Sequence, residues 1–233
     1  MLGLIVYYHV ELTMPKAIVI EDQQLEHAVK VARVSSAENG TRDAALLLTC
    51  FGTGMTVTEI CRLRVSDYLN EAGGIRVESM VRAEIAYNHR ERPVCWVNKK
   101  LTNAIDAHLA ERLERGHGVS TRRMAYRGLD PDSSLFVSGR TGEGLKISAK
   151  VRDGKTYYSA NQLSRLYVRL FAQAGVEGAS AQSGRRTLAV KLRRQGIDLR
   201  HISEILGIES LEAVKRLCAG DPAKLGDIVR RII

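Results

Sequence analysis

The chain has 233 residues, 45% of them hydrophobic, and its 35 Lys and Arg against 26 Asp and Glu give a formal net charge of +9. This composition can fill the core of one large domain and excludes wholesale disorder, and no apolar run approaches the roughly 18 residues of a membrane span. We expect no secretory leader, because the N-terminal stretch MLGLIVYYHVELT has no basic start and no small-residue cleavage site. The basic charge favours a polyanion, above all nucleic acid, as the partner.

We interpret residues 1–17 as a leader or short strand, with Met14 as an alternative start to Met1. Apolar residues then recur with helical spacing from Glu21 onward, and the pattern predicts further helices over 42–53 and from about Thr56. Residues 75–87 and 92–97 are rich in β-branched and aromatic residues, which predicts an antiparallel hairpin with a charged tip.

A helix is predicted from Asn98, followed by a basic loop over 115–134 that holds Arg122, Arg123 and Arg127. The segment SLFVS (134–138) is predicted to be a third strand, and 139–156 an exposed excursion. The C-terminal third predicts helices over 160–174, 184–195, 198–206 and 210–217. The fold class is therefore mixed and mainly α, with a small three-stranded antiparallel sheet.

The four cysteines, at 50, 61, 95 and 218, form no CxxC pair and show no metal-ligand spacing. The sequence therefore predicts neither a zinc site nor a disulfide framework, and we expect a reducing cytoplasm with no metal and no small-molecule cofactor.

Four patterns in order carry a resemblance to a known family. They are RDAALLLTCFGTGMTVTEICRLRVSDYL (42–69), ERPVCWV (91–97), QSGRRTLAVKLRRQGIDLRHISEILG (182–207) and SLEAVKRL (210–217). Together they resemble the catalytic domain of the tyrosine recombinases, or phage integrases, over residues 18–220, with 221–233 as a tail helix. About 20 residues precede the region of resemblance, so we expect the family's separate N-terminal DNA-binding domain to be absent.

The resemblance implies a defined chemistry. In this family a tyrosine attacks phosphorus, two arginines clamp the phosphate, a hairpin lysine protonates the leaving oxygen, and histidines assist. Transferred to this sequence, Arg185 is the one clamp residue retained. The other expected groups are replaced, by Thr56 (first arginine), Tyr87 (lysine), Gln182 and Ile208 (histidines) and Leu217 (nucleophile).

Loss of the first arginine and of the nucleophile predicts a degenerate enzyme, a pseudoenzyme, because a hydroxyl cannot supply fixed positive charge. Cys218 is a poor substitute nucleophile, since one residue along a helix turns a side chain by about 100°. The predicted DNA-binding residues are Arg185, Arg186, Arg193, Arg194 and Arg200, each of which could instead belong to a solvated helix face. Residues 196–217 also resemble a helix-turn-helix, which keeps a transcription factor as an alternative.

Three functional hypotheses follow. The first is an integrase-like protein that binds double-stranded DNA without cleaving it, as an accessory subunit of an active recombinase or a regulator at a mobile element. The second is an active site-specific recombinase with an unorthodox or trans-supplied nucleophile. The third is an interaction module that docks a recombinase without touching DNA. The tail is expected either to join a second copy or to pack on its own domain.

Overall fold

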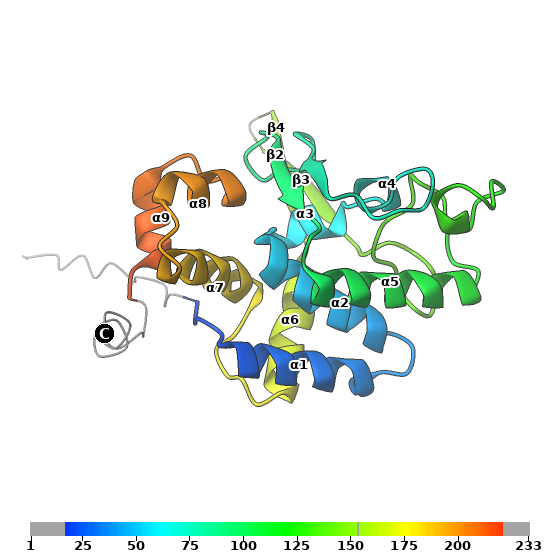
Figure 1. The fold of residues 1–233 in the computed structure, drawn as a ribbon, viewed down its shortest axis with the longest axis horizontal. Coiled ribbons are helices and arrows are strands. Elements are labelled where there is room, and N and C mark those ends of the chain that lie inside the picture. The colour runs from blue at the N-terminus through cyan, green and yellow to red at the C-terminus, as the bar shows by residue number, and fades with distance from the viewer. Residues whose placement is uncertain (1–16, 153, 221–233) are drawn as a thin grey trace, which may run out of the picture.

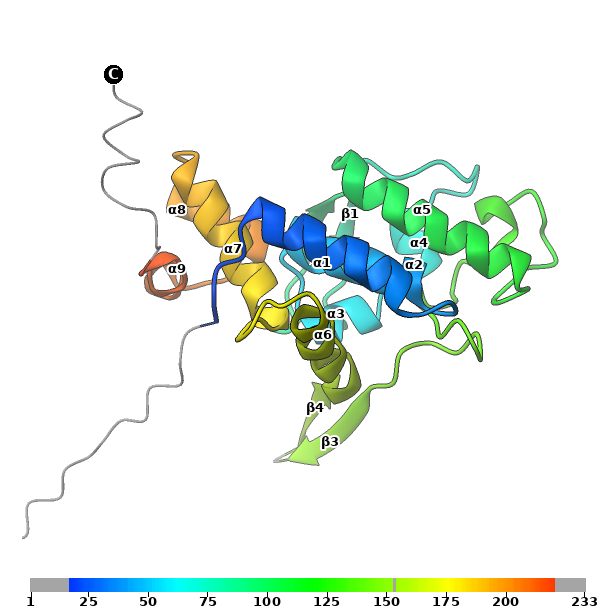
Figure 2. The same ribbon diagram turned by 90° about the horizontal axis from the view of Figure 1, so that it is seen from below.

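The computed structural model describes residues 17–152 and 154–220, so the predicted tail, and the predicted leader except for Ala17, lie outside the described residues. The chain begins with α1 (Asp22–Ser35) and α2 (Gly40–Thr53), which pack against each other (Figures 1 and 2). Nearly every side of α2 is buried, because α1, α5 and α7 surround it. Gly54, in the left-handed region at φ 64°, ends α2 as its sequence predicts.

The predicted first hairpin is confirmed. After α3 (Val57–Cys61) and α4 (Val65–Tyr68), strands β1 (Glu78–Val81) and β2 (Arg92–Cys95) pair antiparallel, with Val81 opposite Arg92. Trp96 fixes the base of the hairpin, because its indole Nε1 donates to the backbone oxygen of Asp67 and to Ser79 Oγ. Helix α5 (Lys99–Glu114) follows and packs on α2.

The fold class is confirmed, but the strands are divided differently from the prediction. The described residues hold two two-stranded sheets, and 134–138 forms only isolated bridges. The physical reason is Arg112, a buried side chain whose Nη1 donates to the backbone oxygens of Ser134 and Leu135 and so takes acceptors that a neighbouring strand would use. The segment is buried as core, which explains its apolar sequence.

The predicted exposed excursion, 139–156, overlaps with a second hairpin, which extends to Ser159. Strands β3 (Ser148–Arg152) and β4 (Lys155–Ser159) pair antiparallel and follow the short 3₁₀ helix η1 (Tyr126–Gly128) and a long connection. The sequence at 153–154 is Asp-Gly, and Gly154 has a φ of 69°. Asp-Gly is a strong hairpin signal, so this hairpin could have been predicted from the sequence.

The four predicted C-terminal helices are confirmed as α6 (Asn161–Gln173), α7 (Ala181–Arg194), α8 (Leu199–Leu206) and α9 (Leu211–Cys218). Helix α7 approaches α2 closely at Gly184, where a Cβ would lie 2.4 Å from Cys50 Sγ. Figure 1 shows α7, α8 and α9 grouped at one end of the molecule.

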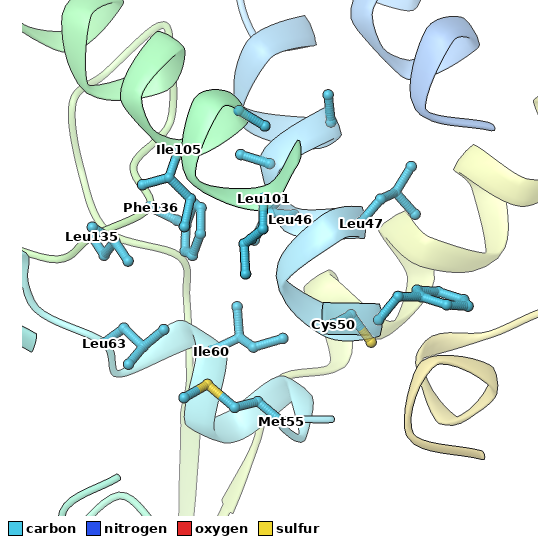
Figure 3. Close-up of a cluster of buried hydrophobic side chains, with 14 of the residues drawn as sticks. Leu46, Leu47, Cys50, Met55, Ile60, Leu63, Leu101, Ile105, Leu135 and Phe136 are labelled. Carbon is cyan, nitrogen blue, oxygen red and sulfur yellow. The ribbon is translucent and has the colours of Figure 1, made fainter. Parts of the chain in front are cut away.

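The buried side chains form two clusters. The main core gathers side chains from α1 to α6, and Figure 3 shows part of it, where α2, α3 and α5 meet residues 135–136. The second, here called the C-terminal cluster, consists of Ala189, Ile202, Leu206 and Val214 with the partly buried apolar residues around them. Within the described ranges, no helix has the length and apolar character needed to cross a bilayer, and no three potential metal ligands gather.

His108 on α5 makes the fold sensitive to acid. Burial, together with the guanidinium groups of Arg112 and Arg42, lowers the pKa of His108 from 6.5 to about 3. The neutral form is therefore favoured in the folded state, so its contribution to stability is fully present above pH 6.5 and is lost as the pH falls toward 3.

We expect the free energy of unfolding to fall by up to about 1.4 kcal/mol per pH unit below pH 6.5 through this residue. His108→Leu, which cannot take up the proton, should show a shallower pH dependence. Urea unfolding at pH 7, 6 and 5 measures the two slopes, and equal slopes would contradict the role of His108.

Candidate functional site

Arg185 lies in the second turn of α7 and joins two other elements. Its guanidinium Nη1 donates to the backbone oxygen of Gly54 at 3.0 Å, and Nη2 donates to that of Leu206 at 2.6 Å. These carbonyls belong to the ends of α2 and α8, where backbone oxygens have no partner within the helix. Burial lowers the pKa of Arg185, but a guanidinium remains protonated under all ordinary conditions.

Tyr87 covers the same guanidinium. The centre of its ring lies 4.8 Å from the central guanidinium carbon of Arg185, a cation–π arrangement. Its hydroxyl donates to the backbone oxygen of Gly207 at 2.6 Å, and Asn88 Nδ2 donates to the same oxygen at 3.0 Å. The connection between β1 and β2 is thereby fixed onto the C-terminal end of α8.

Glu59, in α3, is the buried anion of this region. It is fully buried and forms an ion pair of 2.9 Å with Arg92, which is 3% exposed. The Glu59 carboxylate also accepts from the backbone N–H groups of Thr56 at 2.7 Å and Tyr87 at 3.3 Å. Arg92 in turn donates to the backbone oxygen of Ile205 at 3.2 Å. One carboxylate thus links α3, the first hairpin and, through Arg92, α8.

The pairing of Glu59 with Arg92 is not the one that distance along the sequence would favour. Two arginines lie much nearer in sequence, but Arg64 pairs with Asp132 and Arg62 lies over the ring of Tyr158. The available signal was the Thr-x-x-Glu spacing of a capping box, which the structure contains at Thr56 and Glu59. The partner, Arg92, is 33 residues away and has no local signature.

The positions that the resemblance singled out lie at or beside Arg185, with one exception. Thr56 is the N-cap of α3, two residues beyond Gly54, and Gln182 is exposed one turn before Arg185 on the same helix. Tyr87 stacks on Arg185, and Ile208 directly follows Gly207. The exception is Leu217, whose side chain packs against the C-terminal cluster, as does that of Cys218.

The other predicted DNA-binding arginines have different surroundings. Arg186 is only 7% exposed, and its guanidinium donates to the backbone oxygens of Ala17, Ala219 and Gly220, so its DNA contact stays a prediction. Those bonds tie both ends of the described chain to α7. Arg194 pairs with Glu21, whereas Arg193 and Arg200 are exposed.

Comparison with known proteins identifies relatives across this region. A sequence model of the phage integrase family matches residues 19–219. Tyrosine recombinase XerC of Corynebacterium glutamicum is 28% identical over 205 residues, which cover 87% of this chain and 54% of that protein. Tyrosine recombinase XerA of Pyrococcus furiosus is 24% identical and is matched over 57% of its length. The chain thus spans about half the length of the curated relatives it matches.

Solved structures show the same fold. The crystal structure of XerA recombinase matches with a TM-score of 0.64 at 23% identity, covering 94% of this chain and 64% of that one. XerH site-specific recombinase bound to palindromic difH substrate matches with a TM-score of 0.62 at 19% identity, covering 92% and 53%.

The buried Glu59–Arg92 pair can be tested by its effect on stability. Glu59→Gln leaves the Arg92 guanidinium buried without its counter-charge, so we expect a loss of about 3–5 kcal/mol in the free energy of unfolding. The matched control is Asp132→Asn, which breaks the exposed pair with Arg64 and should cost at most about 1 kcal/mol.

Urea unfolding of both variants measures the difference. Adding Arg92→Met to Glu59→Gln should recover part of the loss, because an apolar side chain needs no counter-charge there. A cost for Glu59→Gln no larger than that of the control would refute the proposed linking role.

Proposed function

Because the chain belongs to the phage integrase family, we propose that it binds double-stranded DNA in site-specific recombination without cleaving the strand itself. Its role is that of an accessory or regulatory protein for an active recombinase. The observation that supports the proposal is a contrast between two positions that the resemblance singles out. The guanidinium of Arg185, at the position that the resemblance assigns to a phosphate clamp, is held by the backbone oxygens of Gly54 and Leu206, whereas Leu217, at the position that it assigns to the nucleophile, is a partly buried apolar residue.

The absence of cleavage follows from the chemistry of the replaced groups. Leucine has no atom that can attack phosphorus, and isoleucine at 208 can neither donate nor accept a proton. The Thr56 hydroxyl lies 3.1 Å from that of Thr58 and caps α3, and it carries no positive charge to stabilise an anionic transition state. Loss of a single preorganised donor typically costs about 100- to 1000-fold in rate.

DNA binding is supported by charge and by helix geometry. The chain carries nine more basic than acidic side chains. Arg185 and the exposed Gln182 lie on the same face of α7, close to its N-terminus, where backbone N–H groups and the helix dipole favour a phosphate. Besides the two hydrogen bonds to carbonyls, the guanidinium fork has further N–H donors. Among the structural relatives, XerH was solved bound to its difH substrate.

A nicked suicide duplex tests the proposal against the two alternatives. We expect salt-dependent binding with a log–log slope near −4 or steeper, since each neutralised phosphate contributes about −0.9, and no covalent adduct. A covalent protein–DNA adduct would establish an active recombinase with an unorthodox nucleophile. No binding even at low salt would favour an interaction module that docks a recombinase.

A charge-matched pair of variants tests the contribution of Arg185. Arg185→Gln should weaken binding about 5- to 10-fold at 0.1 M salt, the effect expected for one lost phosphate contact. Arg33→Gln removes the same charge from an exposed position on α1, on the opposite side of the molecule from α8 and the first hairpin in Figure 1, and should change affinity less than 2-fold. Fluorescence anisotropy measures both, and equal effects would show that only net charge matters.

A further inference from the structure

We propose that the second hairpin, β3–β4, is a DNA-contacting arm that lies on the phosphate backbone beside the candidate site. The proposal rests on the proposed function, that the chain binds double-stranded DNA, and it adds a second contact surface that none of the resemblance's site positions includes. The contact is made by one face of the hairpin, here called the basic face, which is defined by the cross-strand pair Lys150 and Tyr157.

The register of the hairpin places the basic positions on one face and the uncharged positions on the other. Lys150 lies directly opposite Tyr157, and the pair Arg152–Lys155 comes two positions further along. Alternate positions of a strand belong to the same face, so the three basic positions of the two strands share the face of Tyr157. The intervening positions hold Ala149, Val151, Thr156 and Tyr158, which are all uncharged.

The sequence of the hairpin and of the connection before it is rich in positive charge. Residues 140–158 as a whole contain five basic and two acidic side chains. This net positive charge would attract a polyanion laid along the basic face and would repel a basic partner.

The neutral face fixes the hairpin to the body of the molecule. The ring of Tyr158 lies 4.3 Å from the central guanidinium carbon of Arg62, at the C-terminal end of α3. Helix α3 has only five residues, about 7.5 Å of rise, and its N-cap is Thr56 at the candidate site. The base of the hairpin is therefore separated from the region around Arg185 by only the length of α3.

The position of the hairpin suits a ligand that extends across the site. Figure 1 shows the β3–β4 hairpin, β2 and α8 on the same side of the molecule, and in Figure 2 α3 lies between the two hairpins. Lys150 is exposed and Tyr157 is 54% exposed. A duplex that contacts Arg185 and continues past α3 would meet the basic face, where Lys150 offers a charged donor and Tyr157 a hydroxyl donor to phosphate oxygens.

Two variants on opposite faces of this hairpin form a matched test. Lys150→Gln and Thr156→Glu each lower the net charge by one, and both positions are exposed. In fluorescence anisotropy of the full chain with a labelled random-sequence duplex, we expect Lys150→Gln to weaken binding about 5- to 10-fold at 0.1 M salt and to reduce the salt slope by about 0.9. Thr156→Glu should change affinity less than 2-fold.

A third variant removes a contact without changing charge. Tyr157→Ala should weaken binding but leave the salt slope equal to that of the unchanged chain. The reason is that a neutral hydroxyl does not release counterions from the DNA when it binds a phosphate. Circular dichroism of all three variants confirms that the fold is retained, as expected for exposed positions.

The outcomes separate this proposal from the proposed function. If the unchanged chain binds duplex and Lys150→Gln binds equally well, or if Lys150→Gln and Thr156→Glu weaken binding equally, the arm is overturned and DNA binding stands. If the unchanged chain does not bind duplex at low salt, the proposed function fails and the arm fails with it.

Discussion

The buried carboxylate of Glu59 is the constraint on which the site depends. A fully buried anion must be paired and hydrogen-bonded, and Glu59 obtains its partners from three places: Arg92 of β2, the backbone at Tyr87 and the backbone at Thr56. Because Arg92 and Tyr87 also contact the end of α8, this one requirement sets where the first hairpin lies relative to α7 and α8.

Arg185 is part of the same arrangement and has two roles, one in packing and one in the proposed contact with phosphate. Its two carbonyl bonds join the ends of α2 and α8, so the residue contributes to packing whether or not DNA is bound. A guanidinium that is already oriented by such bonds loses little conformational freedom on binding phosphate. This double role gives Arg185 a structural function that does not depend on the other positions that the resemblance singled out, such as Thr56 and Ile208.

Both proposed DNA contacts have the same physical logic. Tyr87 lies over the guanidinium of Arg185, and Tyr158 contacts Arg62 and so fixes the hairpin that carries the basic face. The short helix α3 has Thr56, at the candidate site, as its N-cap and Arg62, which contacts the second hairpin, as its C-cap. It therefore connects the candidate site to the second hairpin. If both proposed contacts form, we expect this surface to contact backbone phosphates more than base edges.

The sequence by itself determined the mainly helical fold class, the order of the helices, the first hairpin and the family, because apolar periodicity and local motifs are properties of neighbouring residues. Only the tertiary structure decided three features. The segment 134–138 is core without being a strand because the distant Arg112 takes its carbonyls, Arg186 is buried because Ala17 and the end of α9 converge on it, and Glu59 pairs with Arg92 instead of a nearby arginine. Each of these features depends on partners more than 20 residues away in the sequence. Packing decides which of several arginines pairs with a buried group, and no local sequence pattern contains that information.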